Sequence, residues 1–165
     1  MYADSFEFWY AFYSYQYTFE FSEGKNINKN SLGLEWAFFT PMSFNNVPVI
    51  YMTGINFTWG DNGNSINAYN NLHFNLYDKS GFYQKDLNQL YLVSGFNFSY
   101  NFDKNIIGIS PEIGFAFFTF LKINILYRYN IYITINNTHE IALAIGLLDI
   151  FQSILFGSMQ KRPYG

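Results

Sequence analysis

A histidine, an acid and a serine lie close together in the stretch NLHFNLYDKSG, as His73, Asp78 and Ser80. A histidine base that activates a serine nucleophile is a common arrangement for acyl transfer. Ser80, however, falls in a polar stretch expected to be a loop, and the chain has no nucleophile elbow of the G-x-S-x-G type. We therefore interpret His73 as a polar side chain enclosed by the fold, and an acyl-transfer site is the alternative.

Thiol and metal chemistry find little support in the sequence. The chain has no cysteine, which excludes a disulfide, a thiolate nucleophile and a cysteine-ligated metal. Its two histidines, His73 and His139, are isolated and form no ligand cluster. We predict no catalytic residue, no metal and no cofactor, and we expect His139, beside Glu140, at the start of a strand and not as a metal ligand.

Charged side chains form the second candidate site. In segments where apolar and polar residues alternate, the charged residues fall at the polar positions and therefore share one face. The predicted cluster consists of Glu7, Glu35, Glu112, Lys122, Arg128 and Glu140, with Glu20 and His73 on the same face. Arg128 is its expected hub, since a guanidinium can bind carboxylates bidentately. We expect Glu112 and Glu140 as its partners, with Glu35 and Glu7 behind them. Such a cluster is a salt-bridged plug, and a proton or ion path is the alternative.

The segment that would position Arg128 shows the clearest alternation in the chain. Isoleucine or tyrosine occupies every odd position from Ile123 to Ile135, whereas Lys122, Asn124 and Arg128 occupy even positions. Successive side chains of a strand point to opposite faces. The segment from Lys122 to Asn137 is therefore predicted to be a long strand with one apolar face and one polar face.

Seven further strands follow the same rule. Their apolar residues alternate within the ranges 5–22, 32–40, 51–59, 66–76, 89–102, 107–117 and 141–147. A change of phase near Phe12 and Tyr13 predicts a β-bulge there, with Phe12 on the outward row and Trp9 pointing inward. Residues 149–156 could be strand or helix.

The connections are marked by polar and turn-forming residues. We expect loops at Ser22–Asn30, Pro41–Pro48 and Asp78–Asp86, with Pro41 ending the second strand. Gly60–Asn64 is the strongest turn signal, and Asp103–Asn105 predicts a tight reversal.

The composition fits a surface divided between lipid and water. Half of the 165 residues are hydrophobic and 23% are aromatic, whereas only 13% are charged. Mean hydropathy is nevertheless −0.03, because Asn, Ser, Thr and Tyr are abundant. No apolar run is long enough for a transmembrane helix. The net charge of −3 and the lack of a long basic stretch argue against nucleic acid as a partner.

Eight long strands with adjacent reversals predict an all-β fold in a single domain, residues 1–165: an eight-stranded antiparallel up-and-down transmembrane β-barrel. The apolar face would meet lipid, and the polar face would line the lumen. Aromatic residues of the outer row are then expected to form a girdle at the headgroup level. These girdle residues are Trp36, Trp59, Tyr15, Tyr17, Tyr127 and Tyr129. A soluble lipid-binding barrel is the alternative architecture.

With its eight amphipathic strands, the chain resembles the small outer-membrane barrels of Gram-negative bacteria, the OmpA/OmpX-type proteins. The stretch GISPEIGFAFFTFLKINILYRYN and the wealth of Asn, Ile, Phe and Tyr are similar to Bacteroidota outer-membrane proteins. The resemblance implies a bacterial outer-membrane location, with a lipid bilayer and lipopolysaccharide as surroundings. Met1–Asp4 shows no secretory signal, so we expect that a signal was removed and that Met1 is an added start codon.

The resemblance leaves several roles open. We expect a structural or interaction role, in its specific form that of an accessory subunit of a larger outer-membrane complex. The alternatives are an outer-leaflet lipid-modifying enzyme, of the lipid A deacylase or acyltransferase type, and a small pore. PagL-type deacylases place Ser and Asn directly after the His segment, but Phe74 and Asn75 follow His73 here. The chain also ends in Tyr164-Gly165, not in the aromatic residue with which many such barrels end.

Overall fold

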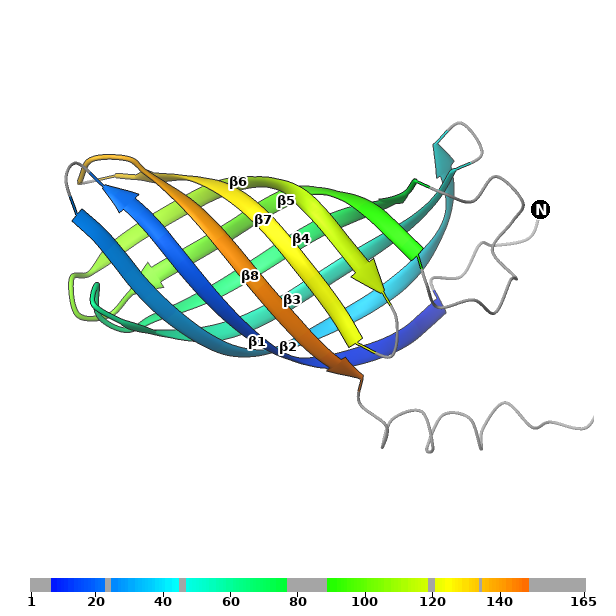
Figure 1. Ribbon diagram of the computed structural model, residues 1–165, viewed down its shortest axis with the longest axis horizontal. Coiled ribbons are helices and arrows are strands. Elements are labelled where there is room, and N and C mark those ends of the chain that lie inside the picture. The colour runs from blue at the N-terminus through cyan, green and yellow to red at the C-terminus, as the bar shows by residue number, and fades with distance from the viewer. Residues whose placement is uncertain are drawn as a thin grey trace, which may run out of the picture.

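The computed structural model describes residues 7–22, 25–44, 47–76, 89–118, 121–133 and 135–148. Eight strands form a closed antiparallel barrel, in which each strand pairs with its sequence neighbours and β8 pairs with β1 (Figure 1). The strands are β1 (Glu7–Ser22), β2 (Lys25–Phe44), β3 (Val47–Gly60), β4 (Ser65–Asn75), β5 (Gln89–Asn101), β6 (Ile106–Phe118), β7 (Leu121–Tyr132) and β8 (Thr138–Leu148). The predicted fold class is confirmed. No helix in these ranges is long and apolar enough to cross a membrane.

The barrel has two distinct ends. At the turn end lie the connections that join β1 to β2, β3 to β4, β5 to β6 and β7 to β8, seen at the left of Figure 1. At the terminal end β1 begins and β8 finishes. Residues in left-handed conformations allow two of the turns: Gly63 has a φ of 89° and Asn105 a φ of 54°. Both turns were predicted from the sequence, since Gly and Asn tolerate positive φ.

The outer wall is apolar over most of its area. Isoleucine, leucine, phenylalanine and tyrosine side chains alternate outward on every strand, and thirty large hydrophobic side chains of the described part are exposed. Even Pro111, which has no N–H, fits into β6: it lies opposite Phe96 of β5, and the pairing of β6 with β7 omits it. Exposed apolar surface on this scale would be unfavourable in water and is what a lipid-facing wall requires.

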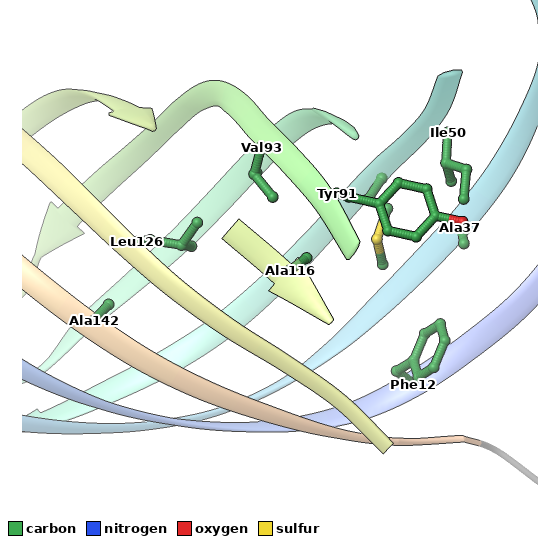
Figure 2. Close-up of a cluster of buried hydrophobic side chains, with 9 residues drawn as sticks. Phe12, Ala37, Ile50, Tyr91, Val93, Ala116, Leu126 and Ala142 are labelled. Atoms are coloured by element: carbon green, nitrogen blue, oxygen red, sulfur yellow. The ribbon is translucent and has the colours of Figure 1, made fainter. Parts of the chain in front are cut away.

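The lumen is filled and has two halves. Toward the terminal end, apolar side chains from seven strands meet in one cluster, shown in Figure 2: Phe12, Ala37, Ile50, Met52, Tyr91, Val93, Ala116, Leu126 and Ala142. Toward the turn end, buried polar and charged side chains replace them. An eight-stranded barrel is just narrow enough for side chains to fill its interior. The lumen is therefore a packed core that is mostly apolar toward the terminal end, where it also encloses Lys122, Glu35 and His73, and polar toward the turn end. These two parts are called the apolar half and the polar half below.

The predicted position of the bulge in β1 is wrong. The pairing of β1 with β2 shifts between Phe8 and Tyr10, before Phe12. Phe12 consequently lies on the inner face, 5% exposed, where it joins the apolar cluster. The alternation of aromatic residues hid this shift, because aromatic side chains occupy both faces of the strand near the terminal end.

Two predicted connections are also wrong. Most of Ser22–Asn30 is not a loop, since β2 begins at Lys25 and pairs with β1 from there. Nor does Pro41 end the second strand: β2 continues to Phe44, and β3 begins at Val47 within the predicted connection Pro41–Pro48. The β2–β3 register shifts between Phe39 and Ser43. An irregularity of this kind tolerates a proline, because the missing N–H falls where the ladder is interrupted.

The ends of other elements differ by a few residues. The strand predicted over Lys122–Asn137 ends at Tyr132, so Ile133 lies beyond it and is 80% exposed. The Asp78–Asp86 loop, the tail at residues 149–156 and the inward direction of the Trp9 side chain lie outside the described part of the chain.

Candidate functional site: the lumen network and the outer wall

Arg128 lies at the centre of the polar half of the lumen. It is directly opposite Glu112 on β6 and Glu140 on β8. Its Nε donates to Glu112 Oε2, and its Nη1 donates to Glu140 Oε1 at 2.8 Å. Its Nη2 donates to Gln16 Oε1 at 3.0 Å, on β1. The guanidinium therefore ties four strands together from inside the barrel, with all three of its nitrogens occupied.

Lys29 extends this network toward the turn end. Its ammonium forms ion pairs with Glu20 and with Glu140, the latter at 3.2 Å. Glu140 also accepts a hydrogen bond from Asn130 Nδ2 at 3.2 Å. One carboxylate thus bridges Arg128 and Lys29. Buried carboxylates need such partners, because an unpaired charge in a low-dielectric interior is strongly unfavourable.

A second ion pair lies apart from the first network. Lys122 forms an ion pair with Glu35, and both side chains are buried. The lysine Nζ lies 5.8 Å from the centre of the Phe12 ring and 4.0 Å from Met52 Sδ. The structure therefore places Glu35 with Lys122 and not behind Arg128 as the sequence had suggested. Glu7 lies in β1, opposite Phe39, and its side chain is outside the described part.

Sequence reasoning missed Lys29, Gln16 and Asn130 as members of the network. Lys29 had been assigned to a loop, although it shares its parity with Ser31 and Glu35 of the same strand. That parity was the available signal, since inward residues of one strand are two positions apart. Gln16 and Asn130 are neutral, and the predicted cluster contained charged residues only.

A narrow cavity of about 40 Å³ opens at the turn end above Arg128. Its wall is mostly amide and hydroxyl groups, and these bond to each other. Asn67 Nδ2, for example, donates to Asn56 Oδ1 at 2.8 Å and to Thr58 Oγ1 at 2.7 Å. A cavity of this size holds only a few waters. The polar half thus contains a small polar cavity that borders the charged side chains of Arg128, Lys29 and Glu140.

His73 lies in the apolar half. It is fully buried between the rings of Tyr91, at 6.2 Å, and Phe118, at 5.8 Å. Neither ring nitrogen has a hydrogen-bond partner among the described residues. Asp78 and Ser80 lie outside the described part of the chain. His73 points into the barrel, away from any lipid that contacts the outer wall.

Three of the six predicted girdle residues, Tyr17, Trp59 and Tyr129, lie toward the turn end on the outer wall, whereas Tyr15 and Tyr127 lie near the midpoints of β1 and β7. Tyr17 and Trp59 both lie opposite Asn30, whose Oδ1 accepts from the Tyr15 hydroxyl at 2.6 Å. On β7 and β8, the latter adjacent to β1, the Tyr127 hydroxyl lies 2.5 Å from Nδ1 of His139, and the Tyr129 ring is 5.1 Å from the His139 ring.

Trp36 does not lie at this level. It is opposite Ala11 and Thr53, farther toward the terminal end. A series of alternating residues shows on which face a side chain lies, but not its depth along the barrel axis.

Polar side chains also face outward in the middle of the wall. Thr53, Asn70 and Ser94 lie near the midpoints of β3, β4 and β5, where Thr53 is opposite Asn70 and Ser94 is opposite Leu72. We call these three residues the wall patch. Within the described strands, other outward polar side chains that are not aromatic lie near a strand end. An amide placed in hydrocarbon without a partner costs roughly 2–7 kcal/mol.

Comparison with solved structures supports this description of the fold. No protein-family model matches the sequence, and no curated protein does. The crystal structure of the outer-membrane enzyme PagL aligns with a TM-score of 0.58 and 10% identity, covering 81% of this chain and 98% of PagL. Neisserial surface protein A (NspA) aligns with a TM-score of 0.50 and 10% identity, covering 84% of this chain and 95% of that protein.

A designed transmembrane β-barrel aligns with a TM-score of 0.46 and 13% identity, too distantly to add to the argument. At such identities the likeness concerns the fold alone. Together with the apolar outer wall and the enclosed ion pairs, it leads to one conclusion: the chain is a small, membrane-embedded eight-stranded β-barrel with the fold of the bacterial outer-membrane barrels.

Proposed function

We propose that this barrel is a structural subunit of the bacterial outer membrane that works through its outer wall, as an accessory component docked in a larger membrane assembly. The observation that carries the proposal is the wall patch of Thr53, Asn70 and Ser94, halfway along an otherwise apolar wall. Polar side chains at membrane depth are unfavourable next to lipid and commonly face protein or water. Elsewhere the wall would contact lipid, including lipopolysaccharide.

The filled lumen supports a structural role over a pore. The apolar cluster occupies the half near the terminal end, and the ion pairs of Arg128 and Lys122 cross the interior. The cavity next to Arg128 is only about 40 Å³, and the wider hollow of about 810 Å³ at the turn end is lined by rim residues such as Lys25, Asp61 and Lys104. A porin-type channel has sixteen or more strands around an aqueous path. In planar bilayers we therefore expect no steady conductance from the purified chain, and a stable open level would support the pore.

The enzyme alternative draws on the shared fold with PagL, which is described as an outer-membrane enzyme. His73 gives it little support, because the ring faces the lumen and is fully buried. A general base must come within hydrogen-bond reach of the proton that it removes. Expression of the chain is expected to leave the mass of lipid A unchanged. A mass shift that His73→Ala abolishes would establish the enzyme instead.

Purification from native membranes tests the docking proposal directly. The tagged chain is extracted in a mild detergent, separated by size, and every protein that co-elutes is identified by mass spectrometry. We expect at least one other integral outer-membrane protein at a fixed ratio to the chain. Elution of the chain without any other membrane protein, from membranes in which it is expressed at its natural level, would refute the accessory role.

A further inference from the structure

The wall patch differs from the rest of the wall in both polarity and size. Thr53, Asn70 and Ser94 come from three adjacent strands, β3, β4 and β5, which lie side by side (Figure 1). Ala68, two residues before Asn70 on β4, adds a small exposed side chain. Small residues allow two membrane-embedded surfaces to approach closely, and polar residues among them can hydrogen-bond across the contact.

Asn70 is only partly satisfied within its own chain. Its Oδ1 accepts a hydrogen bond from the Tyr51 hydroxyl. No described residue accepts a hydrogen bond from its Nδ2, and the side chain is partly exposed on the outer wall. Thr53 differs, since its hydroxyl donates to the Tyr69 carbonyl at 3.1 Å. The patch therefore has one central amide with two free donors and a remaining acceptor lone pair.

We infer that the wall patch is the contact between two copies of this chain, which pair through reciprocal hydrogen bonds of Asn70. A primary amide is self-complementary, because it holds a donor and an acceptor side by side. A two-fold axis along the membrane normal keeps both barrels inserted in the same direction. The same axis brings the midpoint of each β4 to the same depth, so that each Nδ2 meets the partner's Oδ1.

The surroundings of Asn70 fit this symmetry. In an isologous contact, β3 of one copy faces β5 of the other, so Thr53 and Ser94 flank the central amide pair on both sides. Apolar side chains surround the patch on the same strands, among them Ile55, Leu72 and Phe96. They exclude lipid and water from the amide pair. A partner of different sequence would need an acceptor at this depth, whereas a second copy provides one by symmetry.

The inference rests on one part of the proposed function, namely that the outer wall meets protein. It assigns the wall patch to a second copy of the chain, so any other component of the assembly would contact the paired chains elsewhere on the wall. Cross-linking in native membranes tests it, and the absence of native cysteine makes the reagent site-specific. Ala68→Cys places a thiol in the patch. Leu143→Cys is the matched control: Leu143 is the midpoint of β8, as Asn70 is of β4, and β8 lies opposite β4 in the ring. Both variants are treated with a short bifunctional thiol reagent.

We expect Ala68→Cys to give a covalent dimer of the chain, with Leu143→Cys at background. Adding Asn70→Leu to Ala68→Cys should lower the dimer yield about ten-fold, because the reciprocal hydrogen bonds are lost while the wall stays apolar. Heat-modifiable migration on gels establishes that each variant is folded. A folded double variant that cross-links as well as Ala68→Cys would overturn the role of Asn70.

The other outcomes separate this inference from the proposed function. Cross-linking of Ala68→Cys to a different protein would reject the second copy and leave the docking role standing. No adduct at Ala68, in a folded chain at its natural level, would reject both the dimer and the wall patch as a protein contact. Equal dimer yields from Ala68→Cys and Leu143→Cys would reflect random collision and would also refute the inference.

Discussion

Arg128 and Glu112 face each other on β7 and β6, and Glu112 accepts a hydrogen bond from the arginine Nε inside the closed lumen. The same guanidinium binds Glu140 on the other neighbouring strand at 2.8 Å. Three consecutive strands are thereby joined by side chains as well as by their backbone ladders. Each charge in this group compensates the others, so we expect the loss of any one of them to destabilise the barrel.

Replacement of Arg128 by alanine should destabilise the barrel strongly. The substitution removes the positive charge that pairs with the buried carboxylates of Glu112 and Glu140. Removing one member of a buried ion pair typically lowers the free energy of unfolding by about 3–5 kcal/mol. Denaturant unfolding in detergent or lipid measures the change. Lys25→Ala, at the exposed rim, serves as the control and should change little. An unfolding transition of Arg128→Ala equal to that of the wild type would show that the network is not structural.

The ion pair of Lys122 with Glu35 should behave as an independent unit. Because Lys122 lies near Phe12 and Met52, away from the Arg128 network, its coupling should be to Glu35 alone. A double-mutant cycle with Lys122→Met and Glu35→Gln should give about 1–3 kcal/mol of interaction energy, and a cycle of Lys122→Met with Glu140→Gln should give close to none. Comparable coupling in the two cycles would mean that the lumen charges form a single network.

A methyl group at Gly95 should not be tolerated. An alanine Cβ there would lie 2.2 Å from the backbone oxygen of Asn70 and 2.0 Å from Oδ1 of Asn71. Backbone atoms cannot move away without disturbing the β4–β5 ladder, so Gly95→Ala should cost about 1–3 kcal/mol. Gly146→Ala is the matched control, with its nearest neighbour, Lys122 Cβ, at 3.3 Å. Equal unfolding midpoints for the two variants would contradict the packing described here.

Replacement of His73 by leucine should leave the stability unchanged or raise it by up to about 2 kcal/mol. The two ring nitrogens have no hydrogen-bond partner among the described residues, and an apolar side chain of similar size removes the cost of burying them. Equilibrium unfolding of His73→Leu and His73→Ala separates this effect from the loss of volume. A leucine variant as unstable as the alanine variant would indicate that the imidazole has a polar role.

The alternation of residues was sufficient to predict the architecture and the facing of most side chains. It placed Arg128 inward, between strands that carry Glu112 and Glu140, because a period of two determines the face. It could not supply depth along the barrel axis. Trp36 was therefore grouped with Tyr17, Trp59 and Tyr129, which lie nearer the turn end, and Glu35 was grouped with the wrong cation.

Two of the wrong predictions arose because polar residues, or a proline, were interpreted as the end of a strand. Lys29 was assigned to a loop because its neighbours are polar, yet those polar residues belong to β2, and Lys29 itself pairs with Glu20 and Glu140 in the lumen. Pro41 was taken as a strand end, although the register shift of β2 accommodates it. Phe12 looked outward because an aromatic residue suits either the lipid face or a filled lumen.

The orientation of the two faces can be measured at neighbouring positions of β7. Ile125 is 56% exposed on the wall, and Leu126 is 3% exposed in the lumen. Each is replaced by cysteine, and the folded chain in bilayers is treated with a thiol reagent that partitions into the acyl-chain region. We expect rapid modification of the thiol at position 125 and little at position 126, with full modification of both in the unfolded chain. Equal modification of the two folded variants, or the reverse order, would show that the faces are not oriented in this way.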